Sequence, residues 1–305
     1  MLDDISAITA ADEGGFLARL AALPDSYEGP DGLRAEPYGL MAYGEASSLP
    51  SVFSSWVDAP LVISGTQFLF VGGFDYGDAA PLKVSTELAG AEVVVLGHGL
   101  HEPSLQVAPD ALSFYTYASY LAYATGHKED LAEANRTMSE LVNVVRPEVE
   151  TAQNPAKALA WNLWNRVPLL VASRRQAGLV DLTQRVLGRI GKSLALSVGT
   201  HPLETLAGAF EGRSQFGDDV VGLVLGDEDD EVALAVELLE TRVAQIERLA
   251  LAFGETGTAP KDSGAYALVL WYLSAWVAAY LALLHELEPA DSAVYQTLRT
   301  AAPQK

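Results

Sequence analysis

The sequence predicts an α/β fold with two lobes in tandem, each a mostly parallel sheet flanked by helices. In both halves of the chain, short apolar runs alternate with helical patterns, which indicates βαβ units. Residues 110–150 read as helix throughout, with Gly126 and Pro147 as breaks. With 305 residues, 50% of them hydrophobic, the chain can build two cores. We expect a first lobe at 1–108, a helical bridge at 109–153, and a second lobe with C-terminal helices at 154–305.

In the first half, a helical pattern over residues 11–23 ends at Pro24, and residues 79–89 form a second helical pattern. Between and after them lie short apolar runs that are typical of buried strands. The expected strands are Tyr38–Gly44, Pro60–Ser64, Phe68–Val71 and Ala91–Leu96.

The second half repeats this alternation. Asn154-Pro-Ala-Lys157 opens a helix, and the apolar run at 168–172 reads as a buried strand. The acidic run Asp227–Glu231 complements the dipole of the helix that follows, so we interpret it as a solvated cap. Further helices are expected at 176–190, 229–252, 264–286 and from Asp291, and further strands at 194–198 and 220–225.

Residues 265–284 carry no charge and are long enough to cross a bilayer. Three tyrosines and a serine lie within this segment, and its flanks, Lys261-Asp262 and His285-Glu286, are not a basic cluster. We therefore expect a central buried helix or a helix at a subunit interface rather than a membrane span.

Composition excludes several classes of function. The formal net charge of -21 opposes binding to nucleic acid, although a cleft can still hold phosphate on backbone N–H groups and hydroxyls. The chain has no cysteine, and its five histidines form no paired metal-ligand pattern, so we expect neither a metal nor a cofactor. The N-terminal residues lack a signal-peptide pattern, which favours a cytoplasmic protein without a membrane anchor.

Three motifs have residue types that support chemistry. Gly44-Glu-Ala-Ser-Ser48 follows a strand and opens a helix, so Ser47 and Ser48 form either an anion site or an ordinary helix cap. Gly72–Asp78 is a second strand-end loop, and it is either a ligand loop or a plain turn. His201 and Glu204 lie one helical turn apart and form either an acid–base pair or a capping box.

Taken in order, these segments resemble the bifunctional phosphoglucose/phosphomannose isomerases of the sugar-isomerase (SIS) superfamily. Residues 154–171 are similar to the family's Asn-x-Ala-Lys helix and following strand, and His201 with Glu204 is similar to its His-Asn-Glu segment. Residues 272–282 resemble its penultimate helix. Gly44–Ser48 stands where the family has a Gly-Gly-Ser phosphate loop, and Ser292 with Arg299 resembles its terminal pattern.

This resemblance implies two SIS-like lobes and a homodimer that converts glucose or mannose 6-phosphate to fructose 6-phosphate through an enediol. It implies His201 as the ring-opening acid–base group and Glu204 as the replacement base. Ser47, Ser48, Ser292 and Arg299 would bind the phosphate of this small sugar phosphate.

The sequence also departs from the family. No glutamate lies between Glu150 and Glu204, where the family has its catalytic base, and Arg185, Arg189 and Lys192 occupy that neighbourhood. The family's Pro-Arg pair reads Pro109-Asp110. The alternative is therefore a non-catalytic phosphosugar-binding or structural homologue.

Overall fold

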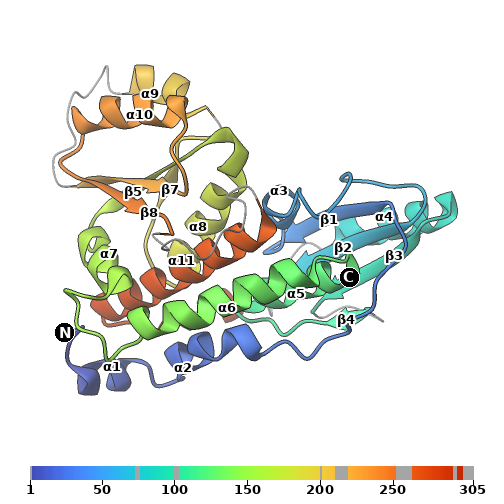
Figure 1. Cartoon of the computed structure of the whole chain (residues 1–305), viewed down its shortest axis with the longest axis horizontal. Coiled ribbons are helices and arrows are strands. Elements are labelled where there is room, and N and C mark those ends of the chain that lie inside the picture. The colour runs from blue at the N-terminus through green and yellow to red at the C-terminus, as the bar shows by residue number, and fades with distance from the viewer. Residues whose placement is uncertain are drawn as a thin grey trace.

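The computed structural model describes residues 2–72, 76–98, 103–199, 201–209, 219–251, 263–290 and 294–297. These residues form two parallel sheets with helices on both faces, as Figure 1 shows. The predicted fold class, two SIS-like α/β lobes in tandem, is confirmed. The division of the chain at residues 108 and 153 stays a prediction.

The first sheet has the strand order β1-β2-β3-β4, and every pair in it is parallel. Its strands are β1 (Tyr38–Gly44), β2 (Thr66–Gly72), β3 (Glu92–Gly97) and β4 (Leu105–Gln106). Along β2, Phe68 and Phe70 join the main core beside Tyr117 and Tyr120, whereas Leu69 packs toward helix α4 (Tyr76–Ala89). Burial of β2 on both faces explains why its sequence is apolar from Phe68 to Val71.

The second sheet has the order β6-β5-β7-β8, and it too is parallel. Its strands are β5 (Val167–Ala172), β6 (Leu196–Ser197), β7 (Val220–Leu225) and β8 (Ile246–Leu249). Helices α9 (Pro202–Ala209) and α10 (Asp230–Glu240) cover one face through a separate apolar cluster. The other face joins the main core of the molecule.

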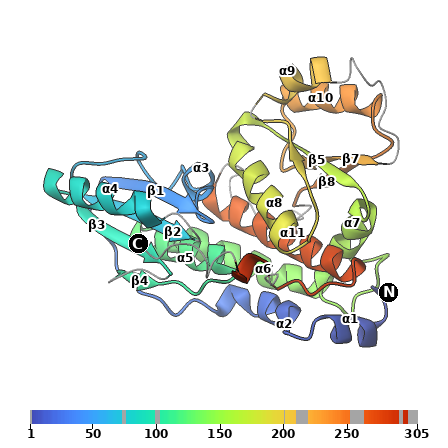
Figure 2. The same ribbon diagram turned by 180° about the vertical axis from the view of Figure 1, so that it is seen from behind.

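The remaining helices run between and around the sheets. They are α1 (Ile5–Ala11), α2 (Phe16–Ala21), α3 (Leu49–Val52), α5 (Ser113–Ala124), α6 (Lys128–Val145), α7 (Pro155–Leu163), α8 (Ala177–Arg189) and α11 (Gly264–Leu284). Figure 2 shows α1 and α2 lying along α6, on the side of the molecule away from α9 and α10.

Helix α11 lies between the two lobes, and every one of its residues is buried (Figure 1). By length and composition it is the one helix in the described ranges that could cross a membrane, but its whole apolar surface is covered within the protein. Its hydroxyl groups bond to main-chain carbonyls: Tyr272 to Leu20 at 2.9 Å and Tyr280 to Val145 at 2.5 Å. Buried polar groups with partners in this way carry little desolvation cost. The expectation of a central buried helix is confirmed.

Three sequence expectations are wrong in detail. Residues 60–64 form no strand, because the buried side chain of Gln67 bonds to the carbonyl of Pro60 and the N–H of Val62. The helix expected over 229–252 ends at Glu240, because residues 246–249 pair with β7 as strand β8. The helix expected over 11–23 is shorter, because Gly15, at φ 64°, precedes its first residue, Phe16.

Candidate functional site

A cavity of about 300 Å³ opens between the two lobes at the carboxyl end of β1. In parallel α/β sheets this is the edge at which ligands bind. Its apolar wall comes from α5, α8 and α11 and includes Phe114, Leu182 and Trp271. Its polar groups are Glu45, Ser113, Tyr117, Arg185, Arg189 and Tyr295. An apolar cavity with a few convergent polar groups is typical of a small-molecule site.

The lobes approach each other closely beside this cavity. Gly178, near the start of α8, faces Ser51 of α3: a Cβ added to Gly178 would lie 2.6 Å from the Ser51 hydroxyl. Only a glycine allows the two backbones to come this near. Helix α8 is thereby fixed against the turn that follows β1.

Arg185 of α8 binds that turn directly. Its guanidinium donates to the carbonyl oxygen of Gly44 at 2.6 Å and to the hydroxyl of Ser47 at 2.5 Å. Gly44 has φ 60°, in the left-handed region, so the chain turns sharply there and presents its carbonyl to α8. Arg185 and Ser47 are both exposed, which places this guanidinium–hydroxyl pair where solvent reaches it.

Glu45 and Arg189 form an ion pair across the gap between the lobes. Their side chains are only 15% and 16% exposed, so little solvent screens the charges. The second carboxylate oxygen of Glu45 accepts a hydrogen bond from the Tyr295 hydroxyl, and the Arg189 guanidinium lies 4.5 Å from the centre of the Tyr295 ring. Three chain segments thus meet around one carboxylate.

Tyr117 of α5 completes the polar wall. Its hydroxyl donates to the carbonyl oxygen of Val71 at 3.1 Å. Burial raises the pKa of Tyr117 above its ordinary value. The charge of Glu45 raises this pKa further, and the charge of Arg189 lowers it. The phenol therefore stays protonated at neutral pH and acts as a donor.

The structure separates the residues expected from the sequence. The Ser47 hydroxyl accepts a hydrogen bond from Arg185, which lines the cavity, whereas Ser48 is 2% exposed, and its hydroxyl has no hydrogen-bond partner among the described residues. His201 and Glu204 are exposed at the start of α9, which packs with α10 on the far side of the second lobe from β1 (Figure 1). Within one chain, these two residues do not join the Ser47 turn.

Not all of the remaining expected residues are among those that the structure describes. Ser292 and Arg299 lie outside the described residues, as do Gly73 to Asp75 of the second strand-end loop. Asp110, which replaces an expected cation, pairs with Arg19 and accepts from the N–H of Leu112 at 2.8 Å. Asp110 therefore supports the start of α5.

Sequence reasoning did not single out Glu45 as a site residue. Two signals in the sequence could have indicated this residue. The first is that Glu45 stands between a strand end and the two serines that were expected to bind phosphate. The other was the pair Arg185 and Arg189, spaced one helical turn apart in a strongly acidic chain. Their meeting depends on how the lobes pack, which no local pattern encodes.

Two parallel α/β lobes that enclose a cavity with convergent polar groups at a strand-end edge define a phosphosugar isomerase-like SIS protein. Residues 16–126 match the phosphoglucose isomerase N-terminal domain, and residues 152–301 match the bacterial phospho-glucose isomerase C-terminal SIS domain. The chain belongs to the phosphoglucose isomerase family. No curated protein sequence matches it.

Solved structures agree with this assignment. A glucose-6-phosphate isomerase like protein from Thermus thermophilus is 32% identical, with a TM-score of 0.84 and 98% of each chain covered. A putative phosphosugar isomerase from Bacillus subtilis is 14% identical, with a TM-score of 0.55 and coverage of 93% of this chain and 96% of that one. Tagatose-6-phosphate ketose/aldose isomerase from Escherichia coli is 10% identical, with a TM-score of 0.55 and coverage of 92% and 90%. The last two show a common fold only.

Proposed function

We propose that this protein interconverts glucose or mannose 6-phosphate and fructose 6-phosphate through an enediol, in the cavity between its lobes. The observation that carries the proposal is the Glu45–Arg189 pair, a carboxylate beside a guanidinium in the wall of a cavity at the strand-end edge. Aldose–ketose isomerisation needs a base for a carbon-bound proton and a cation for the developing enediolate charge.

In this proposal the sugar phosphate enters with its phosphate at Arg185 and Ser47. Both side chains are exposed and already bonded to each other, so an anion can bind a guanidinium and a hydroxyl together. Phe114 and Trp271 offer apolar surface to the C–H face of the sugar. A cavity of about 300 Å³ is at the lower end of the usual range for ligand sites, which suits a small substrate.

The proposal includes a homodimer. Opening the sugar ring needs an acid–base group. His201 is exposed, immediately precedes α9, and is not among the described residues that line the cavity of its own chain. His201 can therefore act only if a second copy of the chain brings it to the cavity. Glu204, one turn along α9, would arrive with it.

The test is proton NMR of fructose 6-phosphate incubated with the purified protein in D2O. We expect glucose or mannose 6-phosphate to appear, together with deuterium at C1 of the ketose. Fructose without the phosphate is the control substrate and should not react. Absence of product and of deuterium uptake at high protein concentration would refute the isomerase.

The second candidate is a protein that binds phosphosugars without catalysis. Both oxygens of Glu45 are engaged, by Arg189 and Tyr295, which favours a structural use of this carboxylate. This candidate predicts that fructose 6-phosphate raises the melting temperature while the D2O experiment shows no exchange.

A further inference from the structure

The chemistry of the proposed reaction requires a carboxylate that reaches the bound sugar. Among the described residues that line the cavity, Glu45 is the one acidic side chain. The wall opposite it, on α8, presents Arg185 and Arg189. In this molecule the carboxylate therefore comes from the first lobe and the cations come from the second.

Glu45 is held in a fixed position. Its N–H donates to the carbonyl oxygen of Gly72 at 3.2 Å, which ties the turn after β1 to the end of β2. Arg189 and Tyr295 each bind one of its carboxylate oxygens. Both oxygens are thus anchored while the Glu45 side chain lines the cavity.

We propose that Glu45 is the base that moves the proton between C2 and C1 of the sugar. This inference rests on the proposed function. Glu45 takes the proton from C2 of the open-chain aldose, and the C–H electrons form the C1–C2 double bond while the electrons of the carbonyl π bond move to O1. The hydroxyl proton on O2 passes to O1, and the carboxyl group of Glu45 returns its proton to C1. The product is the ketose, with all atoms and electrons conserved.

Arg189 takes a second role in this scheme. Once the carboxylate of Glu45 is protonated, its ion pair with Arg189 is lost, and the guanidinium is left beside the new negative charge on the enediolate. The negative charge beside Arg189 thus moves from Glu45 to the enediolate. The guanidinium therefore keeps an anionic partner in a poorly solvated wall.

Glu204 is the rival base. It is exposed on α9, and it is not among the described residues that line the cavity of its own chain. Glu45 is already in the cavity wall of each subunit, so its role does not depend on how two copies associate.

The experiment compares Glu45→Gln, Glu204→Gln and the unaltered protein in the D2O exchange assay, with melting temperature as a folding control. We expect Glu45→Gln to lower the rate of deuterium uptake at C1 by at least about 100-fold, through kcat rather than KM. Glu45→Asp, which keeps the carboxylate, should retain measurable exchange. Glu92→Gln is the matched control, because Glu92 also pairs with an arginine, Arg34, at 2.8 Å, but lies outside the cavity lining.

The outcomes separate the two proposals. If the unaltered protein exchanges deuterium and Glu45→Gln does so equally fast, the role of Glu45 is overturned while the isomerase stands. Loss of exchange in Glu204→Gln alone would assign the base to α9. If the unaltered protein shows no exchange, the proposed function fails, and the role of Glu45 as a base fails with it.

Discussion

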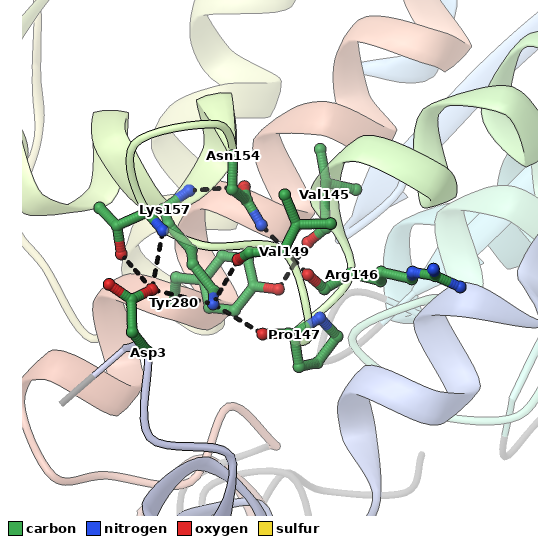
Figure 3. Close-up of polar contacts among 9 residues, drawn as sticks. Asp3, Val145, Arg146, Pro147, Val149, Asn154, Lys157 and Tyr280 are labelled. Carbon is green, nitrogen blue, oxygen red and sulfur yellow. Dashed lines mark hydrogen bonds and ion pairs between the residues drawn. The ribbon is translucent and has the colours of Figure 1, made fainter.

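The ammonium group of Lys157 lies 3.5 Å from the carboxylate of Asp3, which joins helix α7 to a segment near the start of the chain (Figure 3). The Lys157 side chain is fully buried, and it also donates to the carbonyl oxygens of Pro147 at 2.7 Å and Val149 at 2.8 Å. Burial lowers the pKa of Lys157, and the Asp3 charge opposes that shift. Lys157 therefore stabilises the loop between α6 and α7.

Replacing Lys157 with methionine should lower the free energy of unfolding by about 2–4 kcal/mol, because two half-buried carbonyls lose their donor and Asp3 loses its cation. Chemical denaturation followed by circular dichroism measures the change. The control is Lys83→Met, since Lys83 is 39% exposed and lies 3.9 Å from Glu87. That surface pair should contribute less than about 0.5 kcal/mol. Equal effects of the two substitutions would show that Lys157 stabilises the protein no more than a surface ion pair does.

The protein should lose stability at alkaline pH. Burial raises the pKa of Tyr115 to about 12 and that of Tyr266 to about 12, above the ordinary value of 10.0. The folded chain therefore holds these protons when the unfolded chain has released them. The stability from both phenols is fully present below pH 10 and is lost as pH rises through about 12. Urea midpoints at several pH values, with absorbance at 295 nm as the probe of tyrosinate, measure it.

Tyr115→Phe separates this effect from general alkaline damage. The Tyr115 hydroxyl donates to the carbonyl oxygen of Pro24 at 2.7 Å and lies 3.1 Å from the side-chain oxygen of Asn135. Its removal should cost about 1 kcal/mol at neutral pH and reduce the loss above pH 10. An unchanged alkaline profile would show that Tyr115 titrates in the same way in the folded and unfolded chain.

Arg185→Gln should raise KM for fructose 6-phosphate by about 10- to 100-fold and change kcat little, because Arg185 is proposed to hold the non-reacting phosphate. Steady-state kinetics measures both constants. Arg174→Gln is the control, since Arg174 is also exposed near the start of α8 but does not line the cavity. A fall in kcat alone would place Arg185 at the reacting carbons instead.

Mixed dimers test whether His201 acts across subunits. His201→Ala and Glu45→Gln should each be nearly inactive alone. After subunit exchange, half of the dimers are mixed, and each has one cavity with Glu45 intact that receives an intact His201. We therefore expect about a quarter of the original activity to return. No recovery, with mixed dimers demonstrated by native mass spectrometry, would show that His201 does not act in the cavity of the other subunit.

Strand and helix patterns in the sequence predicted the elements whose residues are apolar along most of their length. The limits of β1 and β7 were predicted to the residue, and α11 was recognised because an uncharged run of this length must be covered. The pattern failed where pairing at a distance decides the structure. Residues 246–249 continue a helical sequence, but the exposed edge of β7 offers them main-chain partners, and they become strand β8.

Local sequence patterns predicted the residues of the candidate site less well than they predicted the strands and helices. Ser47 was predicted from a local motif, and its role stays a prediction, although its hydroxyl accepts a hydrogen bond from Arg185, which lines the cavity. Glu45 was not predicted, because its importance comes from Arg189, which lies 144 positions later in the sequence. Trp161 lies in an apolar stretch of α7, yet it is 54% exposed. Residue type alone does not determine which face a side chain takes.

The position of α11 in the sequence has a consequence for biosynthesis. All eight strands that the structure describes precede this helix, yet both sheets turn an apolar face toward the core that it fills. Until the ribosome has passed residue 284, a nascent chain therefore carries two unfinished lobes with uncovered hydrophobic surface. Such surfaces attract chaperones and aggregate readily. The lobes must complete their folding together and late, although each sheet is made of contiguous sequence.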